Sequence, residues 1–279
     1  MAILLGLLAA LSWGVQGVFL KLATSRTTTL TTMISGYVMG LLFLTPFIIP
    51  SLPELRSVDA TFVFWFVLML GVNMTATFSY YRAVQVGQIS LVVPIVASYS
   101  AVTVVLSLLT GESLAPLQLL TLFATVAGIA IASTPRATQG QPAKRSKGLG
   151  YALTASLCYA LVFWIIGAQL REDMNGQLLS WLSFIVQLAI IGPIVILKER
   201  QRLLKHLGIL ALSGGTGALG YIFTNVGLGV ETSVVAVLSS LSSVISVVLA
   251  WFFLRERLAR HQWFGVWLAL AGVVLVSSL

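Results

Sequence analysis

Ten apolar segments, each roughly 20 residues long, constrain this chain more than any other feature of its sequence. A helix of about 20 residues is roughly 30 Å long and crosses the hydrocarbon core of a bilayer. The chain is 58% hydrophobic and only 9% charged, whereas a typical soluble protein has roughly 25% charged residues. We therefore predict an all-α integral membrane protein. Its ten transmembrane helices are expected over residues 2–23, 30–50, 61–82, 89–110, 116–134, 148–170, 175–197, 206–229, 232–254 and 261–278.

The two halves of the chain share residues at a fixed offset. Glu112 and Glu256 lie 144 residues apart, each just before an apolar segment. Six further pairs are identical at the same offset: Leu114 and Leu258, Ala115 and Ala259, Gln118 and Gln262, Ala127 and Ala271, Gly128 and Gly272, and Ser133 and Ser277. Seven matches in 22 positions predict two five-helix repeats, residues 1–134 and 148–279, joined by a hydrophilic linker at 135–147. An odd number of spans per repeat inverts the second repeat in the membrane, as in many transporters.

Basic residues gather on one side of this ten-span arrangement. Fourteen of the 16 Lys and Arg residues fall on that side, and only Arg56 and Arg171 fall on the other. Positively charged connections face the cytoplasm in most multi-pass membrane proteins. The charge pattern therefore predicts a multi-pass protein of the plasma membrane with both termini outside.

The stretch at 79–114, SYYRAVQVGQISLVVPIVASYSAVTVVLSLLTGESL, resembles the EamA-type branch of the drug/metabolite transporter superfamily. Trp13 and Gly14 in the first span, and Glu256 and Gly272 in the last 45 residues, fit the same pattern. The resemblance covers the whole chain. It implies transport of small organic solutes such as amino acids, other metabolites and drugs, usually out of the cell. It also implies cytosolic termini, which is the reverse of what the charge pattern predicts.

Several other functional classes lack the residues they need. The sequence contains no Gly-x-x-x-x-Gly-Lys-Ser/Thr loop for ATP and no Ser/His/Asp or Cys/His arrangement, so an enzyme is not expected. Cys158 is the only cysteine, and His206 and His261 lie at the starts of apolar segments, so no metal site or cofactor is expected. The net charge of +8 lies between the spans, which does not indicate nucleic-acid binding. None of the eight acidic residues lies near a span centre, so we expect uniport, gradient-driven export, or coupling through a residue that the sequence does not identify.

A substrate cavity between the repeats should be lined by polar and aromatic side chains near the span centres. The candidates are Trp13, Gln16, Asn73, Ser79, Tyr80, Ser98, Tyr99, Tyr159, Trp164, Tyr221, Asn225, Ser239, Ser242 and Ser243. Buried amides need partners in lipid, and helix–helix hydrogen bonds satisfy them as well as a cavity does. Tyr80 and Tyr81 also fit an interfacial aromatic belt, which suits them better than the more central Tyr99.

Arg82 ends the third span behind two tyrosines. One interpretation is an interfacial arginine that extends to the lipid headgroups. The other is a guanidinium at the cavity rim that attracts a carboxylate or phosphate of the substrate.

Three further residues are candidates for gating or structure. Pro94 removes a helical hydrogen bond early in the fourth span and predicts a kink there. Glu112 and Glu256 precede the fifth and tenth spans, where a carboxylate stabilises a helix N-terminus; matched gates on opposite faces are the alternative. A run of glycines at 214–220 makes the eighth span the best candidate for a moving element, although close helix packing explains the run equally well.

The sequence as a whole predicts a secondary transporter that exports small organic metabolites or amino-acid-like solutes by alternating access. The alternative is a channel-like facilitator or a lipid translocator. The expected partners are the solute and membrane lipid, with the chain acting as a monomer or a homodimer.

Overall fold

The computed structural model describes residues 1–110, 116–133, 146–170, 174–228, 239, 241–254 and 259–277. Within these ranges the chain is helical and contains no strand. Its elements are α1 (Ala2–Arg26), α2 (Thr29–Ile48), the 3-10 segment η1 (Ile49–Ser57), α3 (Ala60–Val86), α4 (Ile89–Ala97), α5 (Tyr99–Leu109), α6 (Pro116–Ser133), α7 (Ser146–Ile165), the π segment η2 (Ile166–Leu170), α8 (Gly176–Lys205), α9 (Leu207–Leu228), α11 (Ser242–Phe253) and α12 (Arg260–Ser277). The all-helical fold class is confirmed over the described residues.

Six helices of the described chain are long and apolar enough to cross a membrane by length and composition. They lie within Ile3–Arg26, Thr29–Arg56, Ala60–Val86, Gly148–Leu170, Gly176–Lys205 and Leu207–Thr224. Many large apolar side chains stay exposed on their outer faces, including Phe64 at 62% and Leu197 at 85%. Lipid, rather than water, is the solvent that suits such a surface.

Polar residues at the helix ends explain several boundaries. Thr28 accepts a hydrogen bond from the backbone N–H of Thr31 and begins α2, and Asp59 accepts one from Phe62 at 2.7 Å and begins α3. Asn175 begins α8 in the same way, through the N–H of Gln177 at 2.8 Å. Each cap pairs a backbone donor that the helix itself leaves unsatisfied.

The fourth predicted span is interrupted, as Pro94 led us to expect. α4 ends at Ala97 and α5 begins at Tyr99, and the two together occupy the predicted range 89–110. The N–H of Ser98 donates to the carbonyl of Ile95 at 3.2 Å in a tighter turn, one turn beyond Pro94. The part that Pro94 plays in this break stays a prediction.

Several helices continue past the ends of the predicted spans. α1 continues to Arg26 rather than residue 23, α3 to Val86 rather than residue 82, and α8 to Lys205 rather than residue 197. The predicted span at 148–170 agrees with the apolar segment Gly148–Leu170. The residues after Leu197 are charged, but Lys, Glu, Arg, Gln and Leu are all good helix formers. Hydropathy locates the edge of the lipid, whereas the helix itself continues into water.

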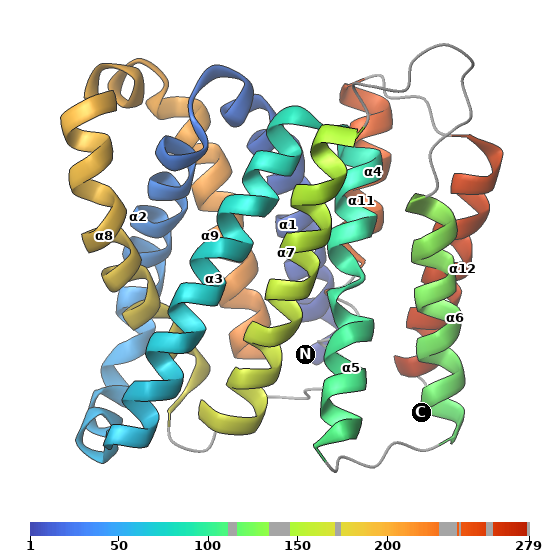
Figure 1. Ribbon diagram of the computed structural model, residues 1–279, viewed down its shortest axis with the longest axis horizontal. Coiled ribbons are helices and arrows are strands. Elements are labelled where there is room, and N and C mark those ends of the chain that lie inside the picture. The colour runs from blue at the N-terminus through green and yellow to red at the C-terminus, as the bar shows by residue number, and fades with distance from the viewer. Residues whose placement is uncertain are drawn as a thin grey trace.

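Corresponding helices of the two halves run in opposite directions. In Figure 1, α1, α3 and α6 run upward and α2 runs downward, whereas α7, α9 and α12 run downward and α8 runs upward. In the two halves α1 corresponds to α7, α3 to α9, and α4 with α5 to α11. The contacts between the halves follow this correspondence: α1 packs on α9 as α7 packs on α3, and α1 packs on α11 as α7 packs on α4 and α5. The other large contacts are α2 with α9, whose exchanged equivalent, α3 with α8, is small, and three direct contacts between counterparts, α2 with α8, α4 with α11 and α6 with α12.

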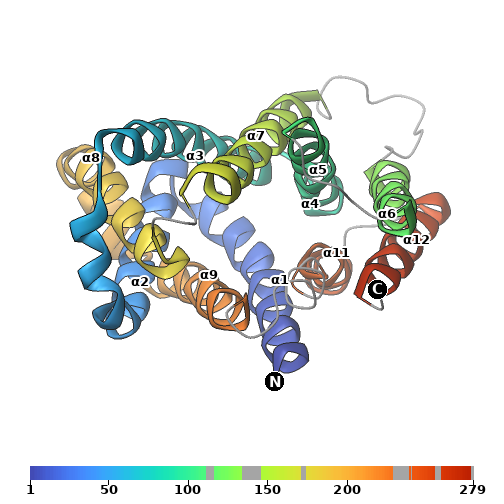
Figure 2. The same ribbon diagram turned by 90° about the horizontal axis from the view of Figure 1, so that it is seen from below.

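Seen from below, the helices lie around a centre (Figure 2). α3 and α7 lie side by side on one side of it, and α9, α1 and α11 lie on the other, while α6 and α12 form a pair at one edge. The larger core cluster draws buried residues from both halves, including Tyr37, Tyr81, Ala152 and Ile222. The interior of the molecule is therefore shared by the two halves.

Candidate functional site

Trp13 on α1 begins the site, because its indole lies directly against α9. The ring N–H donates to the backbone carbonyl of Gly217 at 3.3 Å, and the ring meets Tyr221 edge-on with centroids 5.6 Å apart. Gln16, one turn further along α1, lies against Gly217 as well. These contacts join the first helix of one half to the third helix of the other.

Phe184 on α8 extends this line of rings. Its centroid lies 5.4 Å from that of Tyr221 on α9 and 5.8 Å from that of Tyr37 on α2. Gly40 on α2 leaves room for Phe184, since a Cβ on Gly40 would lie 2.5 Å from the nearest atom of the ring. The rings of four helices thus form one continuous contact series.

Tyr159 on α7 is the centre of a second series. Its ring lies 6.4 Å from Tyr80 on α3 and 6.2 Å from Tyr99 on α5, and Tyr99 stacks on Phe163 at 4.8 Å. The Tyr159 hydroxyl lies 3.4 Å from the hydroxyl of Thr77 and donates to it. Tyr80 in turn contacts Tyr81, which is only 8% exposed.

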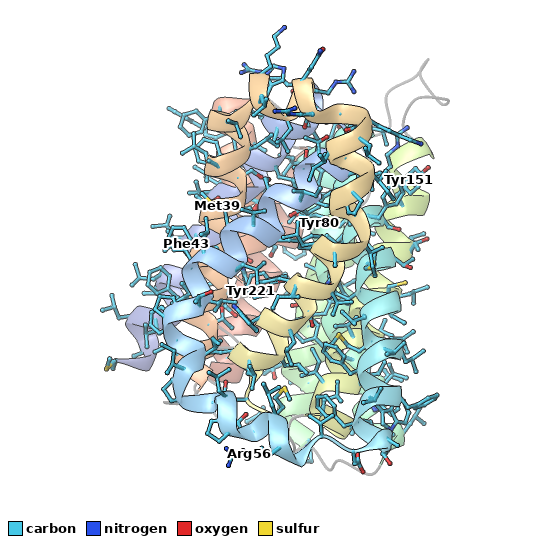
Figure 3. All side chains as sticks on the ribbon, turned by 90° about the vertical axis from the view of Figure 1, so that its left-hand side faces the viewer. Met39, Phe43, Arg56, Tyr80, Tyr151 and Tyr221 are labelled. Carbon is cyan, nitrogen blue, oxygen red and sulfur yellow. The ribbon has the colours of Figure 1, made fainter. Side chains whose placement is uncertain are left out.

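The two series face each other, and we call them together the aromatic cluster. Its members are Trp13, Tyr37, Tyr80, Tyr81, Tyr99, Tyr159, Phe163, Phe184 and Tyr221. The two series approach each other at Tyr81, whose hydroxyl would lie 3.4 Å from a Cβ on Gly36, the residue before Tyr37 on α2. In Figure 3 the labels of Tyr80 and Tyr221 lie at mid-height among the helices and that of Tyr151 lies toward one edge, although Tyr221 is 36% exposed. Six of the seven tyrosines of the chain belong to the cluster, and Tyr151 is the one that does not.

Serines add hydroxyl groups beside the cluster. Ser98, at the break between α4 and α5, lies 3.0 Å from Ser156 on α7 and also bonds to the carbonyl of Ile95 at 2.6 Å. Ser79, next to Tyr80, is 4% exposed. Tyr81 is buried, whereas Tyr80 and Tyr99 are half-buried, and the alternative placement of Tyr80 and Tyr81 in an interfacial belt stays a prediction.

The glycines of α9 form a close contact with α1 and α2. A Cβ on Gly214 would collide with the backbone of Ser35, one on Gly217 with Gln16, and one on Gly220 with Trp13. Small residues permit such contact between membrane helices. Close packing therefore accounts for the glycine run, and movement of α9 stays a prediction.

A separate polar network ties the ends of α1 and α3 together. The ammonium of Lys21 donates to the carbonyls of Val84, at 2.6 Å, and Gly87, at 2.5 Å, where α3 ends. Arg82 donates to Gln85, whose amide donates to the carbonyl of Thr24 at 2.7 Å. The structure thus gives Arg82 a partner on its own helix, and its role in attracting an anion stays a prediction.

Comparison with known proteins relates this chain to a family and to a solved structure. The chain matches the EamA-like transporter family over residues 1–134 and 146–278. It belongs to that family. A crystal structure of a protein covers 100% of the EamA-type chain and 98% of its own, at a TM-score of 0.66 and 18% identity, which supports the fold alone. No curated protein matches the chain.

Other predicted residues of this EamA-type chain lie outside the cluster. Trp164 donates to Thr110 at 3.3 Å and contacts Trp65, in a second core group at the opposite end from Lys21. Asn73 is half-buried two turns before Tyr80, and Ser239 is buried. Ser242 and Ser243 are half-buried at the start of α11, where it is Ser246 that bonds across to α1, at 3.1 Å from the carbonyl of Gly14.

Four predicted residues cannot be placed. Glu112 and Glu256 lie outside the described residues, and so do the side chains of Pro94 and Asn225. Their predicted roles stay predictions.

Sequence reasoning missed Tyr37, Thr77, Phe184 and Gln187. Gln187 carries the signal that selected Gln16 and Asn73, an amide in the middle of an apolar span, and Tyr37 carries the signal that selected Tyr99. Phe184 carries none, because a phenylalanine in an apolar helix is indistinguishable from the lipid-facing residues around it. Its role depends on the packing of α8 against α2 and α9.

Proposed function

We propose that this EamA-family protein is a secondary transporter that moves small organic solutes across the plasma membrane by alternating access, with the aromatic cluster as its substrate site. The observation that carries the proposal is the concentration of six tyrosines between the two halves of the chain. Tyrosine combines a planar apolar face with a hydroxyl, which suits a solute with an apolar body and a few polar groups.

The architecture supports a moving site. Helices in corresponding places run in opposite directions, and the contacts between them are exchanged between the halves. We therefore propose ten spans in two inverted repeats, residues 1–134 and 148–279, with the linker at 135–147. Inverted repeats that rock against each other expose a central site first to one side of the membrane and then to the other.

The distribution of basic residues supports an orientation of the protein in the membrane. Lys21, Arg26, Arg82 and Arg200 lie at one end of the helices, the upper end in Figure 1, and Arg56 lies at the other, the lower end in Figure 3. We propose that the end with most basic residues faces the cytoplasm, that both termini face outward, and that transport is export. Amino-acid-like solutes and other small metabolites are the proposed substrates.

Solute counterflow in proteoliposomes tests this function. The purified chain is reconstituted and loaded with an unlabelled solute chosen from a metabolite panel by its effect on melting temperature, and uptake of the labelled solute is followed. A carrier gives saturable uptake that an internal load accelerates. Flux that rises linearly with concentration and ignores the internal load would instead indicate a channel-like facilitator, and movement of labelled lipid alone would indicate a lipid translocator.

A further inference from the structure

Gln187 on α8 is buried in a way that leaves its amide unpaired. The side chain is 0% exposed, and neither Nε2 nor Oε1 has a hydrogen-bond partner among the described residues. A buried amide without partners is costly, and no water reaches the bilayer core from outside the protein to pair it. Groups of this kind are rare in folded proteins and require an explanation.

Tyr37 on α2 lies at the same level. α2 and α8 pack together and run in opposite directions, and Phe184 contacts both Gly40 and Tyr37 on α2. Because the two helices are antiparallel, a step of one turn forward along α8 matches a step of one turn backward along α2. Gln187, one turn after Phe184, therefore lies opposite Tyr37, one turn before Gly40. The register brings the unpaired amide beside the aromatic cluster.

The Tyr37 hydroxyl is unpaired as well. Tyr37 is 4% exposed, and its oxygen has no hydrogen-bond partner within the described part of the chain. The hydroxyl of Thr77 accepts a hydrogen bond from Tyr159, 3.4 Å away. Thr224, one turn beyond Tyr221 on α9, has a third buried hydroxyl without a partner among the residues described.

The surroundings of these groups are uncharged. α2 and α9 contain no Asp, Glu, Lys or Arg, and α8 contains none before Lys198. A carboxylate or ammonium moved to this place would lose its hydration without gaining a counter-ion. A glutamine amide and a tyrosine hydroxyl each offer both a donor and an acceptor, which suits a group that does the same.

We infer that Gln187 and Tyr37 form a polar subsite of the aromatic cluster that binds an uncharged donor–acceptor group, such as a carboxamide, of a solute whose planar body contacts the rings. The inference rests on the proposed function, since it names the chemical class of the transported solute. It excludes carboxylates and ammonium groups from this end of the site. The rings of Phe184 and Tyr221 hold the body of the solute while Gln187 and Tyr37 hold its polar group.

Three isosteric probes test the subsite with the full chain in lipid nanodiscs. Benzamide offers a donor and an acceptor, acetophenone offers only an acceptor, and benzoate carries a charge. Titration calorimetry, with empty nanodiscs subtracted, measures each affinity. We expect the wild-type chain to bind benzamide about tenfold more tightly than either of the others, the equivalent of one or two hydrogen bonds.

Two variants and a matched control locate the effect. Gln187→Met and Tyr37→Phe keep the size of the side chain and remove the polar group, and each should lower benzamide affinity about tenfold and remove most of its preference over acetophenone. Gln201→Met makes the same change at an exposed position of the same helix and should alter neither affinity. Because the two variants lie on different helices, misfolding of one leaves the other as a test.

Two results would overturn the subsite. One is equal binding of benzamide and acetophenone by the wild-type chain. The other is a preference that survives in both variants, which would make Gln187 the partner of a structural water. Binding in nanodiscs does not depend on transport, so the two proposals fail separately. If counterflow is absent but the wild-type chain still prefers benzamide, the transporter proposal alone is refuted. If counterflow is present but the preference is missing, the subsite alone is refuted.

Discussion

The indole N–H of Trp13 donates to the carbonyl of Gly217, 3.3 Å away in space and 204 residues away in the chain. On the opposite side of the cluster, Tyr159 donates to Thr77. The first bond joins α1 to α9 and the second joins α7 to α3, so the first helix of each half is bonded to the third helix of the other half. The site is therefore held by bonds between two equivalent pairs of helices, and each can be tested separately.

Gly220→Ala tests the close contact of α1 with α9. A methyl group there would collide with the Trp13 ring, which is rigid and held by its own hydrogen bond. Overpacking of this kind costs about 1–3 kcal/mol, so the melting temperature in detergent should fall by several degrees. Gly208→Ala, in the same helix but with open space around the new methyl, should match or exceed the wild type. Equal melting of the two variants would contradict the packing described here.

Lys21→Met tests the polar network at the ends of α1 and α3. Lys21 donates to three backbone carbonyls where α3 ends, and a cation there also complements the helix dipole. Losing these charge-assisted bonds should cost about 1.5–3 kcal/mol of stability. Arg26→Met removes the same charge from an exposed position in the last turn of α1 and should cost less than about 0.5 kcal/mol. Differential scanning fluorimetry compares the melting temperatures of the two variants. Similar losses of stability in both would show that the hydrogen bonds of Lys21 contribute no more than an exposed surface charge does.

Hydropathy predicted much of the fold, because lipid requires apolar outer faces of a fixed length. The helix of the fourth predicted span breaks at Ser98, one turn beyond Pro94, where the sequence predicted a kink. Hydropathy failed at the end of α8, where the helix outlasts the apolar segment as far as Lys205.

The site was harder to predict than the fold. Trp13, Tyr80, Tyr99, Tyr159 and Tyr221 were predictable as polar aromatics near span centres, and all belong to the cluster. Trp164 satisfied the same criterion, but it lies on a different face of α7 from Tyr159, and its indole N–H donates to Thr110. The rotation of each helix about its own axis decides which side chains face inward, and it depends on the neighbouring helices rather than on the segment itself.

Tyr159→Phe tests the use of a cluster hydroxyl in binding. The variant keeps the ring and its contacts with Tyr80 and Tyr99 but removes the hydroxyl that bonds to Thr77. The half-saturation concentration of the solute found in the counterflow screen should rise about fivefold to tenfold. Tyr151→Phe makes the same change at the tyrosine outside the cluster, which is 38% exposed, and should leave uptake unchanged. An unchanged half-saturation concentration in both variants would show that the Tyr159 hydroxyl takes no part in binding.

Cysteine labelling tests the orientation. In a Cys158→Ser background, Ser25→Cys lies exposed at the end of α1 beside Arg26, and Thr61→Cys lies exposed at the opposite end, at the start of α3. An impermeant maleimide added to intact cells should label Thr61→Cys, and should label Ser25→Cys only after lysis. The reverse pattern would place the termini in the cytosol, as the family resemblance implies.

The most direct test of the central claim is access to the cluster from both sides of the membrane. Thr77→Cys, in the Cys158→Ser background, places a thiol where the Tyr159 hydroxyl binds. We predict that an impermeant methanethiosulfonate reagent modifies this cysteine in right-side-out and in inside-out vesicles, and that the transported solute slows both reactions. Modification from one side only, or at rates that the solute does not change, would contradict alternating access to the aromatic cluster.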